Sequence, residues 1–283
     1  MSRRTVRHEI SAEGTALHAG VCVHLRIAPA LPGAGIVFRR SDLASAPVPA
    51  RYDRVTDTRL GTVIAEGDAK VAVIEHLMSA IAGAEIDDLE IHVDGPELPI
   101  LEGDALSFLE CLDRAGIVDQ PGTREGIRVL RRVEVGGGDA TAALEPSDRR
   151  EFELEIEFPS AAIGRQHLIW QFSAEAYGCD IAPARTFGFV HELDALRKAG
   201  LGRGASLENT LAIDGDKVIN ADRMRFADEF VRHKILDAIG DLALAGAPIL
   251  GRFEGRRSGH ALNNRLLRAV FADPANFQRA PLP

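Results

Sequence analysis

The sequence is poor in cysteine and in aromatic residues. Its 283 residues hold three cysteines, Cys22, Cys111 and Cys179, and 5% of the chain is aromatic. An odd number of widely separated cysteines, with no CxxC pair, argues against a disulfide framework and against a zinc site built from cysteines. This cysteine usage is typical of a reducing compartment.

The chain also lacks a long apolar run. No stretch approaches the ~18–20 apolar residues that a membrane span needs. The N-terminus, MSRRTVRHEISAEG, does not contain the apolar core of a secretion signal. We therefore expect a cytoplasmic protein without stable membrane insertion.

Basic residues are outnumbered by acidic ones, 33 to 42, which gives a net charge of −9. Binding to nucleic acid is not expected, because neutralising phosphates requires a basic surface. The hydrophobic fraction of 46% and the charged fraction of 27% are ordinary for a globular protein. At roughly 150 residues per domain, the length predicts two domains.

The first half of the chain predicts strands, a helix, a strand and a second helix. Alternating or short apolar segments favour strands, and the apolar spacing before Gly83 favours a helix. Asp104 is placed to cap the second helix, which ends at Gly116. The predicted strands are 21–29, 35–42, 62–65, 70–74 and 87–100, and the predicted helices are 75–83 and 105–116.

A polar stretch, residues 118–126, is the best linker candidate, since it holds a proline, two glycines and charges. The second half then repeats the order of the first, with an irregular strand–helix–strand insert at 173–220. The pattern predicts an α+β fold of two similar layers, each a sheet with paired helices, that face each other. The predicted strands are 128–135, 152–158, 167–172 and 248–255, and the predicted helices are 191–199, 225–246 and 261–271.

The long helix at 225–246 carries polar residues on an apolar stripe about 80° wide, at 100° per residue. The opposite side is apolar too, so the helix is predicted to be buried almost all round. A histidine and two aspartates there are costly unless they are paired or bind a metal, so a hydrogen-bonded core network and a metal site both account for them. The stripe consists of Phe226, Phe230, His233, Asp237, Asp241 and Leu244.

His233 and Asp237 are one helical turn apart, so both side chains can reach one point, as two metal ligands on a helix must. Nitrogen and oxygen donors without sulfur suit Zn²⁺ and also Fe²⁺. His76 is the best third ligand, because Glu75 beside it would serve as a general base. Taken alone, the Glu75-His76 pair is a weak signal, and an exposed helix start accounts for it.

His260 opens the last predicted helix, within FEGRRSGHALNN. A helix N-terminus disfavours a charged histidine, and a carboxylate such as Asp241 would offset this effect. A solvent-facing capping histidine is the alternative. Arg256 and Arg257 nearby could hold a phosphate. The chain has no GxxxxGK[ST] motif and no strand-anchored GxGxxG, so ATP or NAD chemistry is unsupported.

Six segments resemble the UDP-3-O-acyl-N-acetylglucosamine deacetylases of lipid A biosynthesis, the LpxC family. They are FVRHKILDAIGDLALAG, SGHALNNRLLRAVF, VIEHLMSAIAG, DGPELPILEG, ARTFGF and GTALHAG. The match runs from about Arg4 to Phe271, in order and with similar spacing, and RHKILDAIGD together with GHALNN is highly specific.

The resemblance implies two α+β domains, each with an insert, and an active site between them. In this chain they would be residues 1–120, which contribute Glu75 and His76, and residues 127–273, which contribute His233, Asp237 and His260. The insert at 173–220 would form an apolar tunnel for an acyl chain.

The resemblance also implies roles for individual residues. The zinc ligands would be His76, His233 and Asp237, and the general base Glu75. Lys234 and Thr186 would stabilise the oxyanion, and His260, with Asp241 as its partner, would be the assisting acid or charge stabiliser. Substrate contacts would involve Leu60, Phe158, Phe187, Phe189, Leu207 and Arg257.

This chain departs from the family pattern in three places. Gly138-Asp139-Ala140 stands where many members have Gly-Asp-Lys with a substrate-contacting lysine, so Arg257 is expected to hold more of the sugar-nucleotide. Ser160-Ala161 replaces a frequent His-Pro, and Gly61 replaces a frequent cysteine. The metal and acid–base positions are intact, which predicts activity with a retuned pocket.

We therefore predict zinc-dependent hydrolysis of the N-acetyl group of UDP-3-O-acyl-N-acetylglucosamine by a monomer, releasing acetate. One alternative is an iron enzyme with two histidines and one carboxylate, although such ligands usually lie on strands of a jelly roll. The other is a nucleotide-sugar sensor with a relic metal site, which would need neither Glu75 nor His260.

Overall fold

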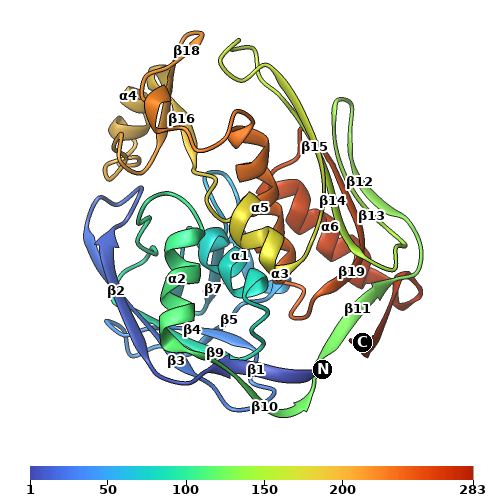
Figure 1. The fold of residues 1–283 in the computed structure, drawn as a ribbon. Helices are drawn as coiled ribbons and strands as arrows, with labels where there is room; N and C mark the ends of the chain where they lie inside the picture. The colour runs from blue at the N-terminus through green and yellow to red at the C-terminus, as the bar shows by residue number, and fades with distance from the viewer. Residues whose placement is uncertain (283) are drawn as a thin grey trace.

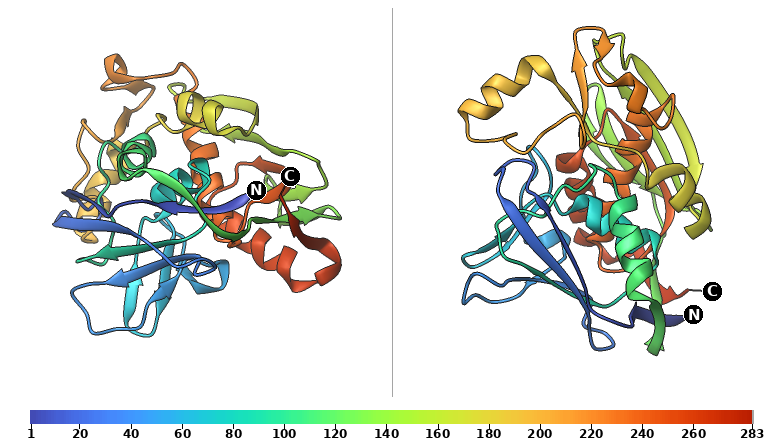
Figure 2. Two further views of the ribbon diagram at one scale, coloured as in Figure 1. Left: turned by 60° about the horizontal axis from the view of Figure 1, so that its bottom comes forward. Right: turned by 60° about the vertical axis from the view of Figure 1, so that its left-hand side comes forward.

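The computed structural model describes residues 1–282, which form a mixed α+β fold (Figure 1). The longer helices lie between a five-stranded sheet from the first half of the chain and a seven-stranded sheet from the second half, as the turned views also show (Figure 2). No helix within residues 1–282 has both the length and the apolar character needed to cross a membrane.

The five-stranded sheet has the order β2-β3-β9-β4-β5. Only β4 and β9 run parallel, and the other pairs are antiparallel. In β3, Val23, Leu25 and Ile27 are buried while Cys22 and His24 are exposed, because successive side chains of a strand point to opposite faces. The strands are β2 (Ile10–Thr15), β3 (Cys22–Pro29), β4 (Ile36–Arg40), β5 (Val48–Pro49) and β9 (Leu89–Val93).

Two small sheets accompany this one. Strands β6 (Val55–Asp57), β7 (Val63–Glu66) and β8 (Ala69–Val71) form an antiparallel meander. Strand β1 (Ser2–Val6) pairs with β10 (Ile117–Thr123). The predicted linker at 118–126 is therefore wrong: most of it is β10, whose backbone pairs with β1 while its polar side chains face solvent.

The seven-stranded sheet is built around β19, which pairs with β13, β11 and β14. The predicted strand at 128–135 is split, because residues 130–132 separate β11, which pairs with β19, from β12, which pairs with β13. The strands are β11 (Glu125–Val129), β12 (Val133–Gly137), β13 (Ala140–Glu145), β14 (Arg150–Glu157), β15 (Arg165–Gln171), β19 (Ile249–Arg256) and β20 (Phe277–Pro281).

The segment between β15 and α5 begins with α3 (Ala174–Ala176) and then forms a three-stranded sheet. Strand β16 (Phe187–Phe189) runs parallel to β17 (Leu211–Asp214), which pairs with β18 (Lys217–Val218), and α4 (Val190–Lys198) connects the first two. In Figure 1 this unit projects from the rest of the fold.

Four longer helices fill the space between the large sheets: α1 (Glu75–Gly83), α2 (Leu106–Ala115), α5 (Glu229–Ala243) and α6 (His260–Ala272). The helix predicted at 225–246 begins only at Glu229, because the side chain of Glu229 accepts the backbone N–H groups of Arg225 and Phe226 and holds them in a turn. Asp104 accepts the backbone N–H of Ser107 at 3.0 Å, which confirms its predicted capping role.

Helix α1 packs closely along α5. A Cβ atom on Gly240 would lie 2.0 Å from the carbonyl oxygen of Glu75, so glycine is required where the two helices meet. Helix α5 is buried around nearly its whole circumference, as predicted. The close approach brings the first residues of α1 beside the middle of α5, where the polar residues lie.

Candidate active site

Three buried side chains from two helices converge between α1 and α5. His76 from α1 and His233 and Asp237 from α5 each offer a ligand atom, and these atoms lie within 4.8 Å of one another. The Nε2 atoms of His76 and His233 are 3.7 and 3.5 Å from Oδ1 of Asp237. The three residues are at most 4% exposed. The one-turn spacing on α5 therefore does place both predicted ligands at one point.

The hydrogen bonds around this cluster leave its donor atoms facing inward. The Nδ1 atom of His233 contacts the carbonyl oxygen of Ala184 at 3.1 Å, which leaves Nε2 toward Asp237. Oδ2 of Asp237 accepts from Nζ of Lys234 at 2.8 Å, but Oδ1 has no hydrogen-bond partner among residues 1–282. A buried carboxylate oxygen without a partner is costly. A divalent cation would satisfy it, so these residues fit a metal ion held by two nitrogens and one oxygen.

The protonation states suit metal binding as well. Burial lowers the pKa of His76 to about 3 and also lowers the pKa of His233, so both imidazoles are neutral. Burial alone would raise the pKa of Asp237, but nearby positive charge, including that of Lys234 and His260, outweighs it and holds that pKa below its ordinary value. The cluster thus presents two neutral nitrogens and an ionised carboxylate.

Glu75, the first residue of α1, lies next to this cluster. Its Oε2 atom accepts the backbone N–H of Thr62 at 2.9 Å, and its Oε1 atom is 3.9 Å from Nε2 of His260. Burial raises the pKa of Glu75 to about 7. A carboxyl group with that pKa can accept a proton near neutral pH. Gly61 has φ of +130°, and a Cβ there would lie 2.7 Å from Oε1 of Glu75, so this chain leaves room for the carboxylate.

His260 and Asp241 form a hydrogen-bonded pair across α5 and α6. Nδ1 of His260 lies 2.8 Å from Oδ2 of Asp241. The same carboxylate accepts from Oγ1 of Thr62 at 2.6 Å and from Nδ2 of Asn263 at 2.8 Å. Burial would lower the pKa of His260, but Asp241 more than offsets it and the pKa rises to about 10. His260 therefore carries a proton at neutral pH, and its Nε2 faces Glu75.

Lys234 completes the charged groups around the cluster. Burial lowers the pKa of its amine, but the contact with Asp237 dominates and the pKa is raised. The ammonium group also lies 5.5 Å from the ring centre of Phe187, on β16. It is thus a charged hydrogen-bond donor held between the cluster and the insert.

The insert is tied to the cluster at its first residues. Glu229, at the start of α5, accepts from both the backbone N–H and the side chain of buried Arg185 at 3.1 Å. The next residue, Thr186, donates its backbone N–H to Gly103 at 2.8 Å. These contacts fix the position of Thr186, two residues after Ala184, whose carbonyl oxygen contacts His233.

Aromatic rings continue outward from this point. The ring of Phe187 lies 5.6 Å from Phe158 and 6.2 Å from His233, and Phe158 lies 5.8 Å from Phe189. Thr186, Phe189 and Leu207 line a cavity of about 370 Å³ that is mostly apolar and passes beneath α4. The predicted substrate contacts on the insert are therefore close together and adjacent to the buried cluster.

Two predicted residues lie apart from the cluster. Leu60 is exposed and lines a second cavity together with His18, whose Nε2 contacts the Leu60 carbonyl oxygen at 2.9 Å. Arg257 forms ion pairs with Glu157 and, at 3.3 Å, with Asp139. No hydrogen bond or ion pair within residues 1–282 joins it to the buried cluster.

Sequence reasoning missed two residues that hold the site together. Thr62 bonds to both Glu75 and Asp241, and only its place two residues after Leu60 connects it to any predicted feature. Asn263 bonds to Asp241 and lies in the GHALNN segment, so the motif itself was the available signal.

Comparisons with known proteins agree with this arrangement. A sequence profile of the family described as UDP-3-O-acyl N-acetylglycosamine deacetylase (LpxC) matches residues 3–272. Three proteins named UDP-3-O-acyl-N-acetylglucosamine deacetylase are among the similar sequences. The protein from Chromobacterium violaceum is 46% identical, with 98% of this chain and 93% of the relative aligned. Those from Phenylobacterium zucineum and Xylella fastidiosa are each 44% identical, over 97% and 99% of this chain and 94% and 93% of their own lengths.

Proposed function

Because the chain belongs to the UDP-3-O-acyl-N-acetylglucosamine deacetylase family, we propose that it hydrolyses the N-acetyl group of UDP-3-O-acyl-N-acetylglucosamine and releases acetate in lipid A biosynthesis. One observation carries the proposal. A buried group of two neutral histidines and one carboxylate lies beside a second carboxyl group, Glu75, and a protonated histidine, His260. Amide hydrolysis needs such a combination of electrophile, base and acid.

His76, His233 and Asp237 are the residues that would hold the metal, and the nitrogen and oxygen donor set favours Zn²⁺, with Fe²⁺ suiting the same donors. When bound, the ion would supply Lewis acidity to the acetyl carbonyl and lower the pKa of a water molecule towards about 7. All other functions in the reaction are assigned to side chains of the protein.

Glu75 takes the proton of the attacking water on Oε1, because Oε2 is already engaged by the backbone of Thr62. As the new C–O bond forms, negative charge develops on the carbonyl oxygen. The ammonium group of Lys234 and the hydroxyl of Thr186 donate to that oxygen. Preorganised donors of this kind need no rearrangement as the charge appears, which is why they favour the transition state.

His260 supplies the proton for the departing nitrogen. Asp241 holds Nδ1 and keeps the ring protonated, so Nε2 is the atom that donates when the C–N bond breaks. The proton that Glu75 has taken then remains on its carboxyl group until the products leave. A single-base version, in which Glu75 itself returns its proton to the nitrogen, differs only in this step.

The acyl chain of the substrate is assigned to the cavity lined by Phe189 and Leu207, which opens beside Thr186. Phe158 and Phe187 form its aromatic entrance, and Leu60 contacts the sugar side from the opposite cavity. This arrangement supports an acyl substrate, because an apolar cavity beside the site can bury the hydrocarbon surface of an acyl chain.

Arg257 is assigned to the anionic nucleotide. Its guanidinium lies beside Asp139, in the same turn where Ala140 replaces a lysine that is frequent in the family. Arg257→Ala should therefore raise KM several-fold with kcat less affected, and Ala140→Lys should partly restore KM. Steady-state kinetics on the UDP-sugar measure both. An unchanged KM in Arg257→Ala would mean that the nucleotide is held elsewhere.

The two halves of the chain are proposed to act as two walls of this site. Residues 1–120 provide Glu75 and His76 on α1, and residues 127–273 provide His233, Asp237 and His260 on α5 and α6. Both halves pair a sheet with two helices, which supports a duplicated arrangement. We propose that the protein acts as a monomer, because every assigned residue comes from one chain.

The test combines metal analysis of the purified protein with an acetate-release assay on the acylated UDP-sugar. The proposal expects one zinc ion per chain and acetate formation that stops when the metal is removed and resumes when zinc is restored. Activity restored by iron alone would favour the iron enzyme. Tight binding of the UDP-sugar without acetate release would identify a sensor and overturn the proposal.

A further inference from the structure

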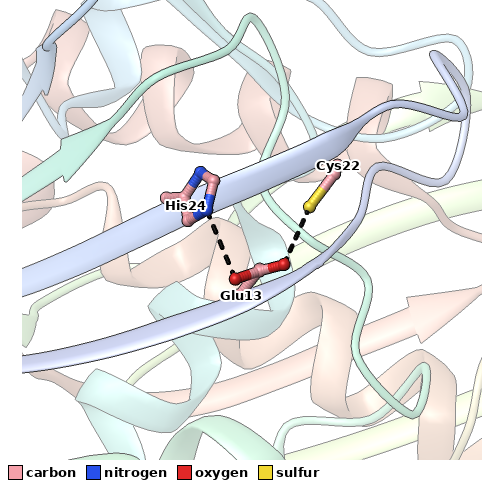
Figure 3. Close-up of side chains that lie close together, drawn as sticks. All are labelled: Glu13, Cys22 and His24. Carbon is pink, nitrogen blue, oxygen red and sulfur yellow. Dashed lines mark hydrogen bonds and ion pairs between the residues drawn. The ribbon is translucent and has the colours of Figure 1, made fainter.

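A second group of possible metal ligands lies on the outer face of the five-stranded sheet (Figure 3). Glu13 on β2 and Cys22 and His24 on β3 point to the same face, because Glu13 pairs with His24 and Thr15 pairs with Cys22 in the antiparallel register. One ligand atom from each lies within 4.8 Å of the others. Strand pairing thus unites donors that are up to eleven residues apart.

The three side chains surround one point. Sγ of Cys22 lies 3.2 Å from Oε1 of Glu13, and Nε2 of His24 lies 3.3 Å from Oε2 of the same carboxylate. The single carboxylate therefore bridges the thiol and the imidazole, as Figure 3 shows. A cation placed among these atoms would replace two polar contacts with three coordinating ones.

Asp94, which follows β9, orients the histidine from the other side. Its Oδ2 atom lies 2.7 Å from Nδ1 of His24, and its Oδ1 accepts the backbone N–H of His24 at 2.8 Å. A carboxylate on one ring nitrogen fixes the tautomer and aims the other nitrogen outward, which is the arrangement usual for histidines that bind metals. Here the nitrogen that remains is Nε2, and it faces Glu13 and Cys22.

We propose that Glu13, Cys22 and His24 form a second site for a thiophilic divalent cation, of which Zn²⁺ is the type. A thiolate, an imidazole and a carboxylate are all zinc ligands, and three protein ligands leave a position for water. Cys22 releases its thiol proton to solvent as the metal–sulfur bond forms, so no redox partner is needed. A zinc site built from cysteines was not expected from the sequence, and this one uses a single thiol among three donor types.

The site is open to solvent, and this determines how firmly it would hold a cation. The side chains of Glu13 and His24 are each 64% exposed, so the cation would exchange with solvent rather than remain through purification. The site would also join β2 to β3 just below the turn at residues 16–21. That turn carries His18, and its carbonyl groups accept from Arg203 and Gly204 of the insert. Metal binding should therefore stiffen this hairpin and raise its resistance to unfolding.

The test is a titration of the reduced full-length protein with Co²⁺. Thiolate coordination gives a charge-transfer band in the near ultraviolet, and the buried His76, His233 and Asp237 group contains no sulfur, so the band reports only a cysteine site. We expect the wild-type protein to develop the band, to saturate at one thiolate-bound ion per chain, and to lose it when Zn²⁺ is added. Zn²⁺ should also raise Tm.

Matched variants make the test specific. Cys22→Ser should abolish the band, whereas Cys179→Ser, which alters the other exposed cysteine, should retain it. His24→Gln keeps the thiol but removes a ligand, so it should weaken Co²⁺ binding by at least the roughly 10- to 100-fold that is typical of losing an outer-shell partner. His233→Ala should keep the band while removing the buried site, so failure of the proposed function is distinguishable from failure of this inference. A band that is absent in the wild type, or that persists in Cys22→Ser, would overturn it.

Discussion

The molecule contains two groups of side chains with the donor atoms to hold a metal ion, and they differ chiefly in burial. His76, His233 and Asp237 come from two helices inside the molecule, whereas Glu13, Cys22 and His24 come from two strands on its surface. In the buried group, burial keeps the imidazoles neutral, and the neighbouring charges keep the carboxylate ionised. In the exposed group, solvent screens the same kinds of side chain. The donor atoms therefore define which ion fits each group, and burial determines whether the side chains already have the protonation states that an ion requires.

The same contrast holds for two histidine–aspartate pairs. The His260–Asp241 distance is 2.8 Å and the His24–Asp94 distance is 2.7 Å, so the two pairs are geometrically alike. Asp241 is buried and saturated with hydrogen bonds from Thr62 and Asn263, whereas the side chain of Asp94 is 39% exposed. In both pairs the aspartate raises the pKa of the histidine, but water competes with the hydrogen bond only in the exposed pair.

Removal of a buried ligand should have the largest effect on metal binding and activity. His233→Ala should lose the metal at sub-micromolar supply and reduce acetate release at least about 10³-fold, because the ion contributes several kcal/mol to charge stabilisation. Circular dichroism should show a largely intact fold. His167→Gln, at an exposed histidine paired with Glu153, is the control and should retain activity. Full metal content in His233→Ala would rule out His233 as a ligand.

The next largest effect is expected at Glu75. Glu75→Gln preserves the shape of the side chain and its contact with Thr62 but cannot accept a proton. Metal content and substrate binding should be retained while kcat falls by about 10²–10⁴. Single-turnover kinetics separate the chemical step from binding. A wild-type kcat would show that another group accepts the proton.

A smaller change is expected from the buried histidine–aspartate pair. The pKa of His260 is raised, so activity that requires its proton should be present at neutral pH and fall as pH rises through that pKa. Asp241→Asn removes the charge that holds the proton, so the alkaline limb of kcat/KM should move to lower pH. Asp94→Asn, the exposed counterpart, should leave the limb in place. An alkaline limb unmoved by Asp241→Asn would assign it to another group, such as Lys234.

The smallest effect tests Thr62, which forms hydrogen bonds to the carboxyl groups of both Glu75 and Asp241. Thr62→Val removes the hydroxyl that donates to Asp241 but keeps the backbone contact with Glu75. Loss of a hydrogen bond to a buried charge should lower the free energy of unfolding by about 1.5–3 kcal/mol. Urea denaturation measures this, and Thr62→Ser should be close to wild type. Equal stability of the valine variant would mean that Asp241 finds another donor.

Much of the site could be predicted because its residues follow helical periodicity. The spacing of His233, Asp237 and Asp241 is a property of α5 alone, and the structure places them on one side of the helix as expected. Glu75 and His76 were proposed from their adjacency alone, which is a weak signal, and the family resemblance strengthened the assignment, because nothing local to a helix start shows which distant helix it will meet. Thr62 was not predictable, since its two hydrogen bonds cross 13 and 179 residues.

The errors in the predicted fold have a similar origin. Residues 118–126 have the composition of a linker, but most of them pair with β1, at the start of the chain. Composition does not reveal such a distant partner. The exposed group of ligands was missed for the same reason. Glu13 and His24 are ordinary surface residues until the register of β2 and β3 places them opposite each other.

Gly240 lies close to the carbonyl oxygen of Glu75, so backbone atoms set the distance between α1 and α5 beside the buried site. Glycine places no side chain between the helices at this point, so backbone atoms limit how closely α1 and α5 approach there. Apolar residues elsewhere in the interior can therefore be substituted while the distance between the His76 and His233 side chains is maintained. The separation of the two helices is therefore sensitive to substitution of the glycine itself.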